Sequence, residues 1–210
     1  METQQPWHVL LICGASGVGK TRVSYPLARH FGVGITEVDD FQVVLERMTT
    51  AAQYPVLHLF RTDPDAFFAL DDAGKLDVAI AYTTVMADAL EAVIANHLDG
   101  GPPLVLEGDF LLPSLAVQDA YAGIPAAGRV RGFTLYEDEV QIARNYLARE
   151  GEPQPDRARW SWNHSEWLRR EAERLGLPTL AARPWETAVA RTLDLLDASY
   201  GPASGLGGGT

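Results

Sequence analysis

The sequence predicts an α/β domain with a mostly parallel, five-stranded sheet flanked by helices. Five short apolar segments recur along the chain, and segments with apolar residues at helical spacing alternate with them. A glycine-rich turn follows the first apolar segment, and acidic residues follow the second and third. A length of 210 residues suits a single domain at residues 1–199 that carries an insertion and a lid, followed by a flexible tail at 200–210.

The first two strands are expected near the N-terminus. The uninterrupted apolar run WHVLLI predicts a strand at residues 7–12 that is buried on both faces. A helix at about 20–30 should follow, and residues 35–38 predict the second strand. A second helix is expected to begin at Phe41, where apolar residues recur at helical spacing.

The segment between the second and third strands is predicted to be a substrate-covering insertion, at about residues 49–98. Its first part, 49–72, contains Pro55, Pro64 and clustered aspartates, which predicts an irregular conformation. Its second part predicts a long helix at 76–98. The inner side of that helix is expected to carry Ile80, Val85, Ala89 and Val93.

The remaining strands and helices occupy the C-terminal half. A Gly-Gly-Pro-Pro break precedes a third strand at 104–106, and the run RVRGFTLY predicts a fourth strand at 129–136 with a helix at 138–149 after it. The segment EGEPQPDRARW is rich in proline and charge, so residues 150–160 predict a mobile lid. The last elements are a helix to about 175 that opens with a capping box of Asn163 and Glu166, a fifth strand at 178–182 and a helix at 185–199.

The residues that follow the first strand carry the strongest functional motif. They read GASGVGKT and match G-x-x-x-x-G-K-[ST] at every fixed position, between an expected strand and an expected helix, which predicts a P-loop NTPase. Glycines let backbone N–H groups point at phosphate oxygens, and the helix N-terminus adds partial positive charge. Lys20 would reach the β- and γ-phosphates, and the Thr21 hydroxyl would ligate Mg²⁺. The expected nucleotide-binding residues are Gly14, Ala15, Ser16, Gly17, Val18, Gly19, Lys20 and Thr21.

The nucleotide is expected to be ATP. The GTPase specificity motif N-K-x-D would need a lysine late in the chain, and the one K-x-D match, at residues 75–77, lacks the asparagine and precedes the third strand. The chain has two lysines and fifteen arginines, which indicates that Lys20 is there for its particular chemistry and not for charge alone. The sequence therefore predicts bound ATP with Mg²⁺.

Acidic residues follow the next two strands at the same edge of the sheet. Ligands bind at the carboxyl ends of parallel strands, so these residues should open onto the same edge as the P-loop. Glu107 and Asp109 are the expected metal-binding acids, although either could instead cap the following helix. Asp39 and Asp40 are candidates for a general base that accepts a substrate hydroxyl proton, or else they are helix N-cap residues.

These motifs resemble those of P-loop kinases of small metabolites, which carry an acid after the second strand and an arginine-bearing lid. The long helix followed by VLEGDFLLP, at residues 105–113, is similar to the 2-phosphoglycerate kinase-like group, although that group has His after Glu-Gly and this chain has Asp109. Residues 38–40, Val-Asp-Asp, resemble the V-D stretch of chloramphenicol phosphotransferase-type and zeta-toxin-type kinases, whose aspartate is the catalytic base. The resemblance covers most of residues 7–199.

The resemblance implies roles for residues outside these motifs. A lid arginine would clamp the transferred phosphoryl group, with Arg149 and Arg157 as catalytic candidates and Arg144 beside the nucleotide. Each of these arginines could instead be a solvated surface charge, and Trp185 could be a core residue. The candidate sets are Arg144, Arg149, Arg157 and Arg159 for the lid, Arg183, Pro184 and Trp185 for the adenine, and His58, Arg61 and Asp63 for the acceptor cover.

Composition limits the expected partners and location. The formal net charge of −11, without any basic run, argues against nucleic acid and anionic membrane as partners. Cys13 is the single cysteine, which excludes an intrachain disulfide. The sequence shows no leader pattern and no apolar stretch approaching about 20 residues, so a cytoplasmic location is expected. The oligomeric state is not predicted.

Together these observations predict a kinase that transfers the γ-phosphate of Mg·ATP to a hydroxyl group of a small-molecule acceptor. The alternative is an ATP-binding regulatory switch that hydrolyses ATP slowly and acts through a protein partner. The insertion above Asp39 suits a small-molecule pocket and favours the kinase. Arg47, just before the insertion, and Arg61, within it, do not form a basic pair, so the sequence does not indicate a phosphorylated acceptor.

Overall fold

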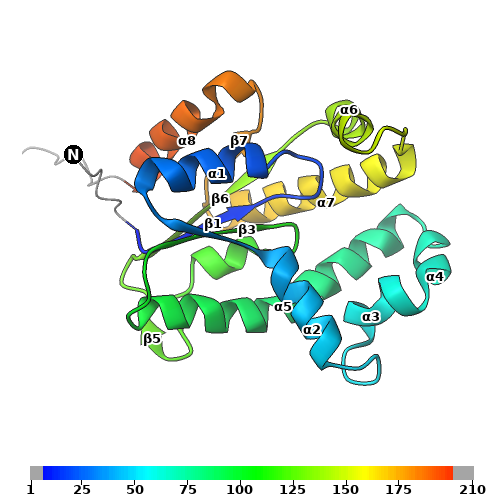
Figure 1. Cartoon of the computed structure of the whole chain (residues 1–210), viewed down its shortest axis with the longest axis horizontal. Coiled ribbons are helices and arrows are strands. Elements are labelled where there is room, and N and C mark those ends of the chain that lie inside the picture. The colour runs from blue at the N-terminus through cyan, green and yellow to red at the C-terminus, as the bar shows by residue number, and fades with distance from the viewer. Residues whose placement is uncertain (1–6, 201–210) are drawn as a thin grey trace, which may run out of the picture.

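The computed structural model describes residues 7–200, which fold around one five-stranded parallel sheet. The strands run in the order β2-β3-β1-β6-β7, so the first strand lies at the centre (Figure 1). Every hydrogen-bonded pair in this sheet is parallel. The predicted fold class and strand number are therefore confirmed. The strands are β1 (Val9–Cys13), β2 (Gly34–Glu37), β3 (Leu104–Gly108), β6 (Val130–Tyr136) and β7 (Thr179–Ala181).

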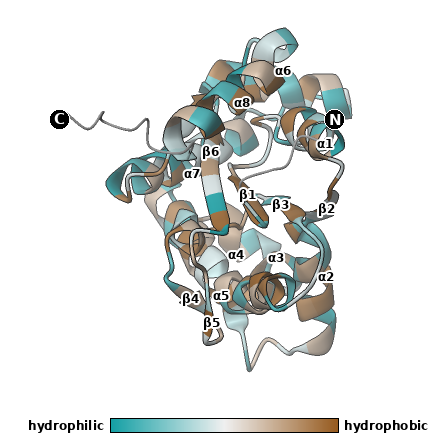
Figure 2. Ribbon diagram, turned by 90° about the vertical axis from the view of Figure 1, so that its left-hand side faces the viewer, coloured by the Kyte–Doolittle hydropathy of each residue, from teal (hydrophilic) through white to brown (hydrophobic). Residues whose placement is uncertain are grey.

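Helices cover both faces of the sheet. α1 (Thr21–Phe31) and α8 (Trp185–Tyr200) pack on one face, and α5 (Asp72–Leu98) packs on the other. Alternate residues of β1 contribute to the two sides, with Leu10 in the core beneath α1 and Leu11 in the core beneath α5. Both side chains are fully buried, which explains why the central strand is an uninterrupted apolar run (Figure 2).

Residues 49–72 contain two short helices, α3 (Pro55–Thr62) and α4 (Pro64–Phe68). Each begins with a proline. Proline suits this position because the N–H group that it lacks would have no partner in the first helical turn. The Asp63 side chain caps α4 by accepting a hydrogen bond from the Ala66 N–H at 3.1 Å. These prolines start helices instead of breaking them, so the predicted irregular conformation is wrong.

The long helix of the insertion, α5, begins at Asp72, where the Asp71 carboxylate accepts a hydrogen bond from the Gly74 N–H at 2.8 Å. Apolar residues are spread almost all round this helix, so spacing alone defines its inner side poorly. The predicted inner side is confirmed in part, since Val85 and Val93 pack against the core, but all four predicted residues are only half-buried. The large side chains that are fully buried are Tyr82, Met86, Leu90 and Ile94.

By length and composition, α5 is the one helix within residues 7–200 that could cross a membrane, contrary to the expectation that no apolar stretch reaches that length. Its buried side chains belong to the same core as the residues of β1 and β3, which is typical of a core helix in a globular domain.

The C-terminal half differs from expectation mainly between α6 (Glu139–Glu150) and α7 (Pro155–Arg174). Only residues 151–154 connect these helices, so the expected loop at 150–160 is mostly helical. Asn163 and Glu166 lie inside α7, and the predicted capping box is therefore wrong. Elements beyond those predicted are a 3-10 helix, η1 (Pro113–Ala116), and a hairpin of β4 (Ala120–Tyr121) and β5 (Ile124–Pro125). The expected flexible tail, beyond the end of α8, lies outside the described residues.

Candidate active site

A cavity of about 430 Å³ opens at the carboxyl ends of β1, β2 and β3. The P-loop forms one wall, and the first turn of α2 (Val38–Met48) and the C-terminal half of α6 contribute others. The lining residues are Ser16, Gly17, Gly19, Lys20, Thr21, Arg22, Glu37, Asp39, Glu107, Gly108, Asp109, Asn145, Tyr146, Ala148, Arg149 and Trp185. The sheet edge thus brings the P-loop together with acids from the second and third strands, as the sequence predicts.

The P-loop conformation depends on glycine at Gly19. The φ angle there is +93°, a conformation that L side chains rarely adopt. A Cβ added at Gly19 would lie 2.0 Å from the indole ring of Trp185. No side chain fits between this part of the loop and Trp185, so glycine lets the first residues of α8 close over the P-loop.

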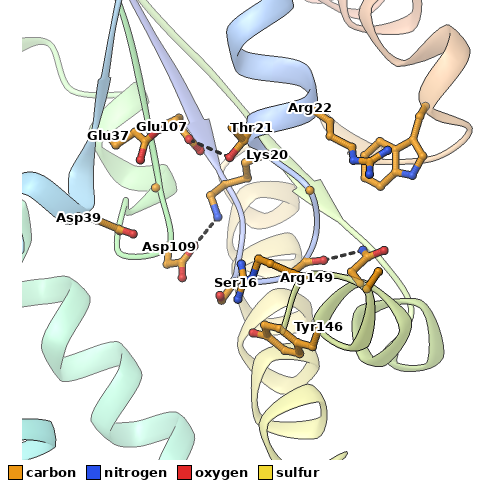
Figure 3. A pocket seen from close by; sticks show the side chains of 16 residues that line it. Ser16, Lys20, Thr21, Arg22, Glu37, Asp39, Glu107, Asp109, Tyr146 and Arg149 are labelled. Carbon is orange, nitrogen blue, oxygen red and sulfur yellow. Dashed lines mark hydrogen bonds and ion pairs between the residues drawn. The ribbon is translucent and has the colours of Figure 1, made fainter. Parts of the chain in front are cut away.

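Lys20 is buried and points into the cavity (Figure 3). Its ammonium forms an ion pair with Asp109 and donates a hydrogen bond to the Ala15 carbonyl at 3.2 Å. Burial acts to lower the pKa of this ammonium, but the carboxylates of Asp109 and Glu107 outweigh burial and raise it above its usual value. Lys20 therefore stays charged at neutral pH.

Glu107 and Thr21 form the part of the cavity best suited to a divalent cation. The Thr21 hydroxyl lies 3.5 Å from Glu107 Oε1, while the buried Oε2 atom has no hydrogen-bond partner among the described residues. Burial raises the pKa of Glu107 to about 7, with Lys20 opposing the effect. No three His, Cys, Asp or Glu side chains within residues 7–200 form a complete metal site. A hydroxyl and carboxylates that leave room for water and phosphate oxygens suit Mg²⁺.

Asp39 reaches the cavity because α2 begins at Val38, three residues earlier than expected. Val38 packs directly on Gly108, where an added Cβ would lie 2.4 Å from the Val38 Cβ. Partial removal from water and the charge of Asp109 raise the pKa of Asp39 above its usual value. Both aspartates keep exposed surface, but only Asp39 lines the cavity. The N-cap residue of α2 is Glu37, so the N-cap interpretation of the two aspartates is wrong.

Among the predicted lid arginines, Arg149 lines the cavity and Arg157 does not. Their guanidinium groups stack on the ring of Tyr146, with centroid distances of 5.1 Å and 4.4 Å, and both pair with Glu150. Arg144 and Arg159 do not line the cavity. Arg159 instead pairs with Glu139 at 3.4 Å near the surface.

The predicted adenine-binding residues separate in the structure. Arg183 pairs with Glu137 at 2.6 Å and Asp138 at 3.1 Å, and neither it nor Pro184 lines the cavity. Trp185 does line it, with the guanidinium of Arg22 5.2 Å from its ring centroid. The expected acceptor cover also lies outside the lining, since His58 is buried and bonded to Thr49 at 3.0 Å. Arg61 bonds to His58, and Asp63 caps α4.

Several lining residues were not predicted from the sequence. Two of them, Glu37 and Arg22, could have been recognised from their position next to a predicted element. Glu37 ends the second strand, and Arg22 directly follows the P-loop motif. Asn145 and Tyr146 had no such signal, because they reach the cavity only through the packing of α6 against the P-loop. The Asn145 amide donates a hydrogen bond to the Gly17 carbonyl at 2.7 Å.

The central parallel sheet and the glycine loop after β1 define a P-loop protein with the fold of small-molecule kinases. Solved structures with this fold include a sugar kinase from Janibacter sp. HTCC2649, 19% identical, with a TM-score of 0.54 over 91% of this chain and 95% of that one. A shikimate kinase from Acinetobacter baumannii in complex with shikimate is 16% identical, with a TM-score of 0.52 over 92% and 93%. A gluconokinase from Sinorhizobium meliloti 1021 is 17% identical, with a TM-score of 0.51 over 94% and 95%.

Among curated proteins, a 2-phosphoglycerate kinase from Methanocaldococcus jannaschii is 26% identical over 142 residues. The match covers 66% of this chain and 45% of that relative, so the chain spans less than half the length of the curated relative it matches. No protein-family model matches the sequence.

Proposed function

We propose that this protein is an ATP-dependent kinase that transfers the γ-phosphate of Mg·ATP to a hydroxyl group of a small molecule. The observation that carries the proposal is the cavity itself, which joins Lys20 and Thr21 of the P-loop to Asp39, Glu107 and Asp109 at the ends of the neighbouring strands. The names of the relatives, which include sugar, gluconate, shikimate and 2-phosphoglycerate kinases, support a small-molecule acceptor.

Each residue has a role that follows from its chemistry. The P-loop amides and Lys20 bind the phosphates, and Thr21, Glu107 and Asp109 hold Mg²⁺. When bound, Mg²⁺ neutralises the charge of the phosphate oxygens. Asp39 accepts the proton of the acceptor hydroxyl, and its raised pKa makes its carboxylate a better base than an aspartate with the usual pKa. Asp40, one residue away, is the weaker candidate.

Arg149 supplies the lid cation, and Arg157 supports it through the shared stacking on Tyr146. The exposed guanidinium of Arg149 can turn away from Glu150 toward the transferred phosphoryl group, where its bidentate donors match the phosphoryl oxygens. Trp185, with Arg22 against its ring, offers an aromatic surface for the adenine. The acidic surface is consistent with a cytoplasmic enzyme that binds neither nucleic acid nor membrane.

The experiment is incubation with Mg·ATP and a pooled library of hydroxyl-bearing metabolites and antibiotics, with mass spectrometry scoring each compound that gains a phosphoryl group. Lys20→Ala should abolish the product, and Lys75→Ala, which removes the other lysine, should not. Full activity of Lys20→Ala would refute the assignment. Slow ATP hydrolysis without any product, but accelerated by a protein partner, would instead support the regulatory switch.

A further inference from the structure

We propose that Ser161 and Asn145 are positioning residues that hold the P-loop in its phosphate-binding conformation through hydrogen bonds to two of its carbonyl groups. The inference rests on the proposed binding of nucleotide at the P-loop. Ser161 belongs to α7 and Asn145 to α6, so two helices far along the chain hold two adjacent carbonyl groups of a loop near the N-terminus.

The Gly17 carbonyl is held by a two-step chain of hydrogen bonds from α6. The side-chain amide of Asn145 donates to the Gly17 carbonyl at 2.7 Å. One helical turn earlier, Gln141 Nε2 donates to Asn145 Oδ1 at 2.8 Å. Because this donor occupies the oxygen of Asn145, the amide group is oriented with its own donors toward the loop.

The Ser16 carbonyl is held in the same way from the α7 side. The Ser161 hydroxyl donates to the Ser16 carbonyl, and the Tyr146 hydroxyl donates to Ser161 Oγ at 3.2 Å. A serine hydroxyl has one proton, so accepting from Tyr146 leaves that proton for the loop. Ser161 and Tyr146 are both buried, and water therefore does not replace either bond.

These bonds fix the direction of the loop amides. In a trans peptide the C=O and N–H groups point in opposite directions, so carbonyls held toward α6 and α7 turn the N–H groups of Gly17 and Val18 away from these helices. The Val18 N–H indeed makes a long 3.5 Å contact with the Ala15 carbonyl, which also accepts from Lys20 inside the cavity. Gly17 has a φ of +78°, and a glycine backbone is not held in one conformation by its own side chain. The hydrogen bonds from α6 and α7 therefore fix a backbone conformation that the residue itself does not.

The test separates positioning from direct contact with the nucleotide. Ser161 and Gln141 do not line the cavity, so their substitution removes no direct contact with a ligand there. Ser161→Ala and Asn145→Leu should each weaken Mg·ATP binding about five- to tenfold, the loss expected for one hydrogen bond. Gln141→Ala, at a half-exposed position, should weaken it about two- to threefold because it acts only through Asn145. Ser161→Thr keeps the hydroxyl and should restore binding.

Thr192→Val is the matched control, since Thr192 is a buried residue whose hydroxyl donates to the Ala188 carbonyl at 2.8 Å within α8. Titration calorimetry measures Mg·ATP affinity, and thermal unfolding without nucleotide measures stability. Weaker binding by the Ser161 and Gln141 variants, with the control unchanged, supports the positioning role. Unchanged affinity in both variants overturns it while leaving the kinase proposal intact. A wild-type protein that does not bind Mg·ATP overturns the proposed function and this inference together.

Discussion

Acidification from pH 7.5 to 5 should destabilise the protein through His164 of α7. This side chain is 2% exposed, and its Nε2 atom has no hydrogen-bond partner among the described residues. Burial lowers its pKa from 6.5 to about 4, and the charge of Lys20 reinforces the effect while Asp109 opposes it. At pH 5 the folded protein therefore keeps the ring neutral, whereas the unfolded chain protonates it almost completely.

The size of the effect follows from these two pKa values. A group with a lowered pKa in the folded state contributes stability that is complete above the unfolded value and is lost as the pH falls toward the folded value. Between pH 7.5 and 5 the loss is about 2 kcal/mol in the free energy of unfolding. Urea unfolding of the wild-type protein and of His164→Gln, each at both pH values, measures it as the difference between the two pH effects.

Comparison with the variant is necessary because Glu107 acts in the opposite direction. Its pKa is raised to about 7 in the folded protein, so the folded state binds a proton more readily and gains stability as the pH falls. Glu107 is present in both proteins, and its contribution cancels in the subtraction. If His164→Gln loses as much stability on acidification as the wild type, the buried neutral histidine is not the cause and the reasoning is refuted.

Three further predictions concern the cavity. Gly19→Ala should abolish Mg·ATP binding in calorimetry, because the new Cβ would lie 2.0 Å from the Trp185 ring. The control is Gly32→Ala, where φ is +65° but the space around the glycine is open. It should cost only about 1–2 kcal/mol of unfolding free energy and leave binding intact. Asp39→Asn should lower kcat by about 10²–10⁴-fold and Asp40→Asn far less, and equal losses would contradict the choice of Asp39. Removal of Mg²⁺ with EDTA should weaken ATP binding by roughly tenfold or more, and metal-independent affinity would count against the proposed roles of Glu107 and Asp109.

The parts of the site that sequence alone predicts are those fixed by neighbours in the chain. The P-loop needs its glycines, Lys20 and Thr21 in fixed order, and a buried strand before them places the loop at the sheet edge. Parallel pairing of β2 with β3 and of β3 with β1 then brings the acids that follow these strands to the same edge. The sequence therefore predicts both the position of the P-loop and its acidic neighbours.

Features that depend on packing between distant elements are not available from local patterns. A proline in the sequence can mark either the end of a helix or its first residue. Pro155 is the first residue of α7, inside the expected loop. Arg183 resembles a nucleotide-binding arginine until the fold places it beside Glu137. Asn145 reaches the P-loop from 128 residues away, and only the packing of α6 against that loop shows the contact.

Charge is divided across the cavity in a way that orders the proposed reaction. Glu37, Asp39, Glu107 and Asp109 lie on the β2 and β3 side of Lys20, and Arg22 and Arg149 lie on the other side (Figure 3). Lys20 is the cation between them, and its ion pair with Asp109 must yield when a phosphate takes the ammonium. The Asp109 carboxylate, whose side chain is 22% exposed, would then lack its partner cation, and an unpaired charge in a partly buried site is costly. Mg²⁺ held by Thr21, Glu107 and Asp109 would supply that cation, so we expect ATP and the metal to bind together.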